Sequence, residues 1–192
     1  YNKDSNGAMI ECPDYVSNLN CLLYSEQFQT KTEGHLNVHT SRWALGEIDY
    51  ANGLFNEKFS GTLDYGFDFY AAQSFSGENV IMAPQTFVGK PTFMGWLNMW
   101  DRNVPSAKYG FAGMLTVPRK IDVINNSLYQ TPIVKTKNKI EKVVNGTLTD
   151  QVVTGVITIK ATNLENLTLK LRDNGENYTT LCLENGKWVF NR

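Results

Sequence analysis

Residues 167–172 read Leu-Thr-Leu-Lys-Leu-Arg, and this strict alternation of apolar and polar side chains decides the fold class. Successive side chains of a β-strand point to opposite faces, so the stretch predicts a strand with one buried and one wet face. The dipeptides at 174–175 and 185–186 are both Asn-Gly, which favours tight hairpin turns. Partner strands are expected at 156–159 and 178–183. This part of the chain therefore predicts an antiparallel β-sandwich.

Short apolar runs between turn-forming residues also fill the first two thirds of the chain. Strands are expected at 19–24, 43–48, 80–83, 92–100 and 111–118. Asn52-Gly53 marks another tight turn. No window shows a convincing 3.6-residue apolar period, which argues against helices. The prediction is an all-β protein built as a sandwich, barrel or propeller.

A change in amino-acid composition and pattern near Arg119 predicts a domain boundary. Aromatic residues thin out beyond this point, and alternation takes over. We expect one domain over residues 1–118 and a second over 119–192, with 121–134 as the connecting segment.

Composition excludes several classes of partner. The 192 residues include 18 basic and 19 acidic side chains, and a net charge of −1 gives no electrostatic footprint for nucleic acid or anionic lipid. No apolar run approaches the roughly 18 residues that a membrane helix needs. Aromatic residues make up 12% of the chain, which suits sheets and also carbohydrate sites, where flat rings stack on sugar faces.

The cysteines and histidines do not form a metal-binding pattern. The count of three cysteines is odd, and we expect Cys12, Cys21 and Cys182 to be free thiols in or near cores. Free thiols slightly favour a reducing, cytoplasmic compartment, although several Asn-x-Ser/Thr triplets argue the other way. The segment holding His35 and His39 favours extended chain, so both are expected at the surface or in turns. No metal or cofactor is predicted.

The candidate for chemistry is Glu11, within Met-Ile-Glu-Cys-Pro-Asp-Tyr at 9–15. A carboxyl group among such apolar neighbours is expected to be partly desolvated, which disfavours its charged form. A Glu that holds its proton near neutral pH can donate that proton to a leaving group. The alternative is a strand-edge Glu that points at solvent.

Five motifs, in order along the whole chain, resemble glycoside hydrolase family 32, the invertases, fructanases and sucrose-6-phosphate hydrolases. They are Glu11-Cys12-Pro13-Asp14, Asp64-Tyr65-Gly66-Phe67-Asp68-Phe69-Tyr70-Ala71, Gly95-Trp96, Leu115-Thr116-Val117-Pro118-Arg119 and Tyr129-Gln130-Thr131-Pro132. The resemblance implies a five-bladed β-propeller followed by a β-sandwich. It also implies retaining hydrolysis of terminal β-fructosides such as sucrose or sucrose 6-phosphate.

The resemblance also implies roles for individual residues. Glu11 is the expected general acid/base, and Cys12 is the neighbour that tunes it. Trp96 is expected to line the fructose pocket, with Asp64 and Tyr70 at its border. The alternative for Trp96 is core packing, and for Asp64 it is turn chemistry beside a glycine.

The chain also departs from the family pattern. It contains neither the Asn-Asp-Pro motif of the nucleophile nor the Arg-Asp-Pro motif that stabilises the transition state. Both motifs belong upstream of Glu11, so we expect a fragment made of the last propeller blades and part of the sandwich. Such a fragment is expected to be inactive alone and to self-associate through open strand edges.

A second reading is a non-catalytic carbohydrate-binding or structural all-β module. It would use Trp43, Trp96 and Trp100 as stacking platforms and give Glu11 no role.

Overall fold

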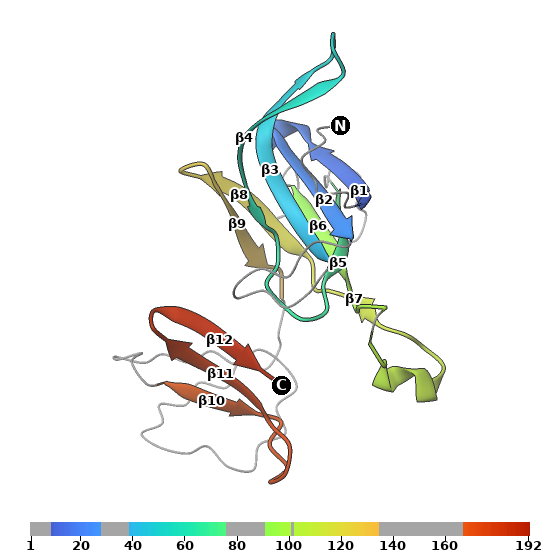
Figure 1. Cartoon of the computed structure of the whole chain (residues 1–192), viewed down its shortest axis with the longest axis vertical. Helices are drawn as coiled ribbons and strands as arrows, with labels where there is room; N and C mark the ends of the chain where they lie inside the picture. The colour runs from blue at the N-terminus through green and yellow to red at the C-terminus, as the bar shows by residue number, and fades with distance from the viewer. Residues whose placement is uncertain (1–8, 28–38, 76–90, 101, 135–166) are drawn as a thin grey trace. The chain divides into compact units, whose positions relative to one another are not determined.

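The computed structural model describes residues 9–27, 39–75, 91–100, 102–134 and 167–192. The chain forms two compact units, residues 1–134 and 135–192 (Figure 1). The strands expected at 80–83 and 156–159 lie outside the described residues. The prediction of an all-β protein is confirmed, because every long element described is a strand.

A four-stranded antiparallel sheet opens the first unit, in the order β1-β2-β3-β4. Its strands are β1 (Met9–Val16), β2 (Cys21–Gln27), β3 (Thr40–Asp49) and β4 (Leu54–Thr62). Pro13, which cannot donate to a ladder, falls on the outer strand β1, where that loss is tolerated. The predicted turn at Asn52-Gly53 joins β3 to β4, and Gly53 takes the φ of +66° that such a turn requires.

The second sheet runs β5-β6-β8-β9, with the short strand β7 also paired to β6. Its strands are β5 (Tyr70–Phe75), β6 (Thr92–Leu97), β7 (Met114–Leu115), β8 (Arg119–Ile124) and β9 (Ser127–Pro132). The strand expected over 111–118 is reduced to two residues. Gly113, at φ +72°, departs from extended backbone directly before β7, and a Cβ there would meet the Asn98 Cβ at 2.7 Å and the Trp96 indole nitrogen at 2.8 Å.

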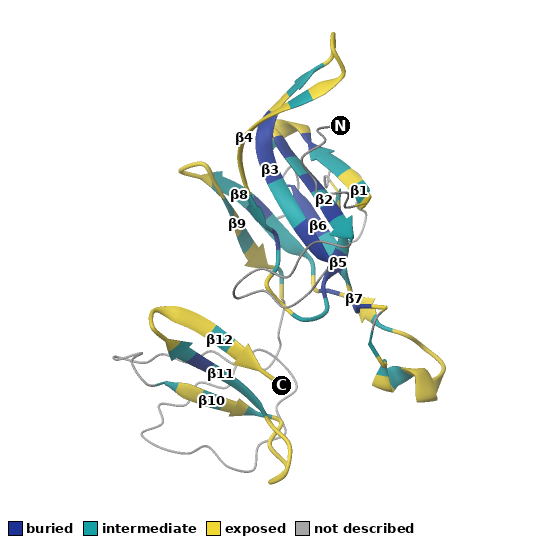
Figure 2. Ribbon diagram, in the orientation of Figure 1, coloured by how far each residue is buried: buried dark blue, intermediate teal, exposed yellow. Residues whose placement is uncertain are grey.

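The core of the first unit is shared by the two sheets. Leu23 of β2 and Phe93 of β6 are completely buried, and both belong to one apolar cluster with Leu45, Leu63 and Phe69. Figure 2 shows buried positions along β2, β3 and β6. The apolar side chains that alternate along each strand therefore face one another across the sheets, which fixes the pairing register of both.

The expected boundary at residue 119 differs from the structure. The segment 121–134, expected to be a connection, supplies the hairpin of β8 and β9, and Ile121 is completely buried in the core cluster. Backbone pairing of Thr92 with Lys120 joins this hairpin to β6. The first unit therefore ends at Val134, because strand pairing rather than aromatic content decides where it stops.

The second unit contains β10 (Thr168–Leu171), β11 (Thr179–Glu184) and β12 (Lys187–Asn191) in one antiparallel sheet. The predicted alternation is confirmed, because Leu169 and Leu171 are more buried than Thr168 and Lys170. The predicted turn at 185–186 is also confirmed, with both residues at positive φ.

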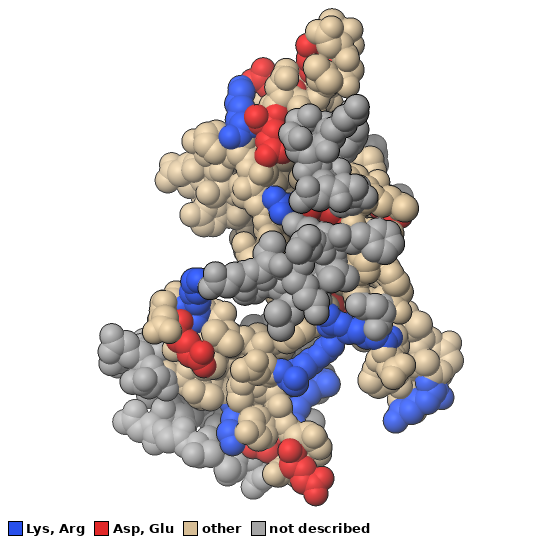
Figure 3. Space-filling view, in the orientation of Figure 1, with Lys and Arg blue, Asp and Glu red and all other residues tan. Residues whose placement is uncertain are grey.

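No helix among the described residues is long and apolar enough to cross a membrane. On the face drawn in Figure 3, basic and acidic side chains both occur. The outer strands of the first sheet are β1 and β4, and self-association through such edges stays a prediction.

The packing of the two sheets makes Gly95 of β6 a sensitive position. A Cβ there would lie 2.5 Å from the Phe69 ring, so Gly95→Ala must displace a buried aromatic side chain. We expect the variant to lose about 1–3 kcal/mol of unfolding free energy, measured by urea denaturation of this chain. Ser60→Ala, on exposed β4, is the control and is expected to change it by less than about 0.5 kcal/mol. Equal stability of the two variants would contradict the packing described.

Candidate active site

Two irregular strands bring the candidate residues together. The pairing of β1 with β2 shifts register between Glu11 and Asp14, and Cys12 takes a φ of +50°. The pairing of β5 with β6 shifts directly after Tyr70, and Ala71 takes a φ of +51°. A bulge re-aims side chains and is common beside active sites. Each bulge here follows immediately after a side chain of the site.

The Glu11 carboxylate is half-buried and held by two donors. Its Oε2 atom accepts a hydrogen bond from the Tyr70 hydroxyl at 3.0 Å and a second, short one from the Gln27 amide. Gln27 lies in β2 and Tyr70 in β5, so the carboxylate is positioned by both sheets. The alternative of a strand-edge Glu that points at solvent does not describe this geometry.

Hydrogen bonds between the two bulges keep the strands in place. The Gln73 side chain donates to the Cys12 carbonyl at 3.2 Å, and the Ser74 backbone N–H donates to the Asp14 carboxylate. The Ala71 N–H donates at 3.1 Å to the hydroxyl of Ser25, which is completely buried. The strained backbone is therefore tied to its neighbours at several points.

Electrostatics in the site favour neutral partners around Glu11. Burial raises the pKa of the Tyr70 hydroxyl well above its usual range, and the hydrogen bond to Glu11 and the charge of Glu11 raise it further. Burial, followed by the charge of Glu11, also raises the pKa of the Cys12 thiol. Tyr70 therefore stays protonated and remains a donor to the carboxylate.

An aromatic wall continues from Tyr70. The Tyr70 ring meets the Trp100 ring edge-on at 4.8 Å between centroids, and Trp100 stacks on Trp96 at 6.0 Å with 9° between planes. His39 covers Trp100 with centroids 4.6 Å apart. Trp100 is 46% exposed, so part of this aromatic wall is open to solvent.

Not every predicted site residue joins this group. Glu11, Cys12 and Tyr70 lie together, and Trp96 extends the wall. Asp64 instead forms a 2.5 Å ion pair with Arg119 and accepts the Gly66 N–H at 2.7 Å.

Sequence reasoning also missed two participants. His39, expected at the surface or in a turn, is only 5% exposed. Gln27 carries no signal of its own in the sequence, because its contact with Glu11 follows from the pairing of β1 with β2. Trp43, expected as a stacking platform in the module reading, lies over Gly61 of β4 instead. Within the described part of the chain, no group of three His, Cys, Asp or Glu side chains could hold a metal ion.

A carboxyl group held by neutral donors near stacked indoles, on an all-β scaffold, is an arrangement that suits a carbohydrate-active protein, because flat rings pack on sugar faces. Residues 1–132 match the Glycosyl hydrolases family 32 N-terminal domain. The chain belongs to glycoside hydrolase family 32, and the family expected from its motifs is confirmed.

Curated relatives support the same family. A sucrose-6-phosphate hydrolase of Staphylococcus xylosus is 38% identical over 136 residues, which cover 69% of this chain and 26% of that protein. A sucrose-6-phosphate hydrolase of Zymomonas mobilis is 33% identical over 193 residues, covering 90% and 35%. The chain therefore spans only about a quarter to a third of the length of these relatives.

Solved structures agree on the fold. The GH32 β-fructofuranosidase BmSUC1 of Bombyx mori is 30% identical, with a TM-score of 0.57 over 68% of this chain and 27% of that one. The sucrose-6-phosphate hydrolase of Lactobacillus gasseri is 26% identical, with a TM-score of 0.51 over 65% and 25%. These neighbours have a five-bladed β-propeller followed by a β-sandwich.

The raised pKa of Tyr70 predicts a specific dependence of stability on pH. Because folding favours the neutral phenol, Tyr70 contributes stability that is present below its ordinary pKa of 10.0 and is lost as the pH rises above it. We expect Tyr70→Phe to lower the unfolding free energy by about 1.5–3 kcal/mol at neutral pH. We also expect it to lose less stability than the wild-type chain between about pH 9 and pH 11.

Urea unfolding at several pH values tests this prediction. Tyr129→Phe, which alters a tyrosine that is 52% exposed, is the control and should follow the wild type. Parallel stability curves for wild type and Tyr70→Phe above pH 10 would rule out the neutral, buried donor.

Proposed function

We propose that this chain acts within a longer polypeptide (the parent protein) as the part of a retaining β-fructofuranosidase that carries the general acid/base, Glu11. The observation that carries the proposal is the Glu11 carboxylate held by Tyr70 and Gln27. Family membership supports the reaction class, and this geometry supports the choice of Glu11.

The chemistry assigns two successive tasks to Glu11. In the first step, its protonated form donates to the glycosidic oxygen as the bond to the fructosyl carbon breaks. In the second step, the carboxylate accepts a proton from the water that releases fructose. Retaining hydrolysis needs a second carboxylate, about 5–5.5 Å away, as the nucleophile. In this proposal the parent protein provides that carboxylate from outside these residues.

The two donors suit this cycle because each keeps its role when Glu11 changes charge. Tyr70 and Gln27 both offer hydrogen to the same Oε2 atom, so Oε1 is the atom that can face the substrate oxygen. The fixed carboxylate loses little freedom in the transition state. Cys12, directly after Glu11 on the bulge, adds an uncharged polarizable neighbour.

We propose a terminal β-fructoside such as sucrose or sucrose 6-phosphate as the substrate. Relatives are named as sucrose-6-phosphate hydrolases and a raffinose invertase, and a variant of the Bombyx mori enzyme is described in complex with sucrose. Trp96 and Tyr70 would border the sugar, because a sugar ring presents apolar C–H groups that pack on such rings.

The acid role predicts a dependence on the leaving group. In the parent protein, we expect Glu11→Gln to lower kcat on sucrose by about 10²–10⁴-fold, because a poor leaving group needs its proton. On an aryl β-fructoside, whose leaving group departs without protonation, we expect Glu11→Gln to lower the rate of the bond-breaking step much less. Glu47→Gln, at an exposed ion pair, is the matched control and should keep wild-type rates.

The same experiment separates the enzyme from the non-catalytic module. Equal losses of kcat/KM on sucrose and on the aryl substrate would remove Glu11 from the acid role, because kcat/KM does not include the later water step in which Glu11 acts as the base. Unchanged turnover with Glu11→Gln would favour the module, in which Glu11 has no function.

A second prediction concerns the isolated chain. Because one carboxylate alone cannot form the glycosyl-enzyme intermediate, residues 1–192 are expected to release no fructose from sucrose above the Glu11→Gln background. A sensitive coupled assay of both proteins, with the parent protein as positive control, measures this. Release that depends on Glu11 would refute the assignment of the nucleophile to another part of the parent protein.

A further inference from the structure

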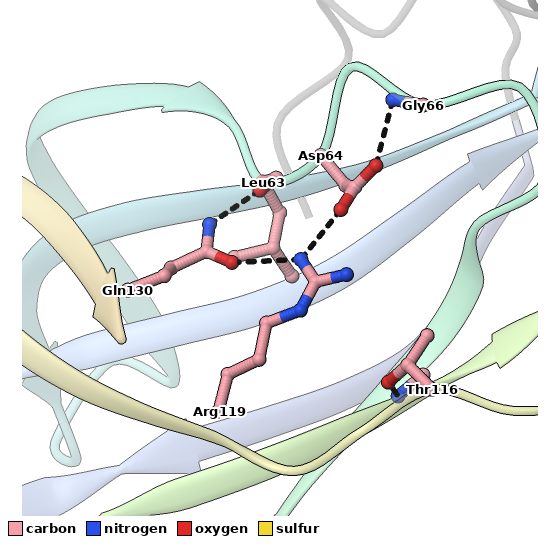
Figure 4. Close-up of polar contacts among 7 residues, drawn as sticks. Leu63, Asp64, Gly66, Thr116, Arg119 and Gln130 are labelled. Atoms are coloured by element: carbon pink, nitrogen blue, oxygen red, sulfur yellow. Dashed lines mark hydrogen bonds and ion pairs between the residues drawn. The ribbon is translucent and has the colours of Figure 1, made fainter. Parts of the chain in front are cut away.

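A polar cluster, here named the Arg119 clamp, lies apart from Glu11 and links the ends of the two sheets. Arg119 Nη1 donates to Asp64 Oδ2 at 2.5 Å and to Gln130 Oε1 at 2.9 Å. The Gln130 amide donates in turn to the Leu63 carbonyl at 2.5 Å. Figure 4 shows these residues converging from β8, β9 and the segment after β4.

The clamp is largely shielded from water. The Arg119 and Asp64 side chains are 20% and 15% exposed. Asp64 also accepts the Gly66 N–H, so each of its two oxygens has a donor. A shielded ion pair with satisfied partners holds its geometry better than an exposed pair, because a broken contact leaves a charge without compensation.

Arg119 also covers two aromatic rings of the core. Its guanidinium carbon lies 4.9 Å from the centre of the Phe69 ring and 5.8 Å from that of Phe93. The Phe69 ring in turn packs directly on Gly95. A Cβ atom at residue 95 would lie only 2.5 Å from this ring. Only a planar cation can satisfy two acceptors and stack on a ring at the same time.

This packing reaches the candidate active site through the backbone. Phe69 directly precedes Tyr70, and Gly95 directly precedes Trp96. Tyr70 and Trp96 are register partners in the pairing of β5 with β6, at the residue where the bulge begins. Thr116 also holds the backbone next to Trp96 in place, because its hydroxyl accepts a hydrogen bond from the Gly95 N–H at 3.1 Å.

We propose that the Arg119 clamp is a positioning device for the Tyr70 donor. By fixing Phe69 against Gly95, it holds the start of the β5 bulge, and so keeps the Tyr70 hydroxyl within reach of Glu11. The inference rests on the proposed function, because it assigns catalytic value to that hydrogen bond. Asp64 then acts through Arg119 and touches no substrate.

The test is a double-mutant cycle of Arg119→Lys and Tyr70→Phe in the parent protein, with kcat and KM measured on sucrose. Lysine keeps the charge but cannot hold Asp64, Gln130 and Phe69 together. We expect Arg119→Lys alone to lower kcat by about tenfold with little change in KM, and by less than about threefold in the Tyr70→Phe background. Lys58→Gln, at an exposed ion pair, is the control.

The outcomes separate this proposal from the proposed function. Full turnover of Glu11→Gln overturns the proposed function. Suppose that Glu11→Gln loses turnover but the effects of Arg119→Lys and Tyr70→Phe on kcat are additive. This result overturns only the positioning role of the Arg119 clamp, because an effect through general stability does not depend on Tyr70. If Arg119→Lys fails to fold, Gln130→Met replaces it in the cycle, because it removes one acceptor and keeps the ion pair. The same non-additivity is expected.

Discussion

The hydrogen bond from Tyr70 to Glu11 is the contact on which the candidate site depends, because it joins two sheets that the chain forms separately. The two residues are 59 positions apart. Their side chains meet only if β5 packs against β1 in one register and both bulges form. A slip of one residue in either strand would turn one of the two side chains to the opposite face.

The backbone carries a cost for this contact. Cys12 and Ala71 both occupy the left-handed region, which costs non-glycine residues about 1–3 kcal/mol each. Hydrogen bonds to the Cys12 carbonyl and the Ala71 N–H offset that cost. Each strained residue directly follows a side chain of the site, so the strain serves to aim Glu11 and Tyr70.

Polar groups in the first unit divide between chemistry and support. Glu11 accepts two hydrogen bonds from described residues on one oxygen, and in the proposed function its other oxygen serves the substrate. Asp64 has a donor on each oxygen and holds Arg119 over the core. Two carboxylates from motifs of the same family resemblance thus have different surroundings, and the surroundings decide which one is suited to proton transfer.

The sequence alone determined the all-β class, the turns at 52–53 and 185–186 and the alternation along β10. These depend on local rules, since side-chain period and turn preference act within a few residues. The family, and Glu11, Tyr70 and Trp96 as candidate site residues, came from the resemblance of motifs that are continuous in the chain.

Only the tertiary structure decided which residues surround Glu11 and where the first unit ends. Gln27 reaches Glu11 across a strand pairing, and Asp64 meets Arg119 from 55 positions away. The β8–β9 hairpin belongs to the first unit because Ile121 packs in its core. Such contacts depend on register and sheet packing, which bring distant residues together and are set by the whole fold rather than by neighbouring residues.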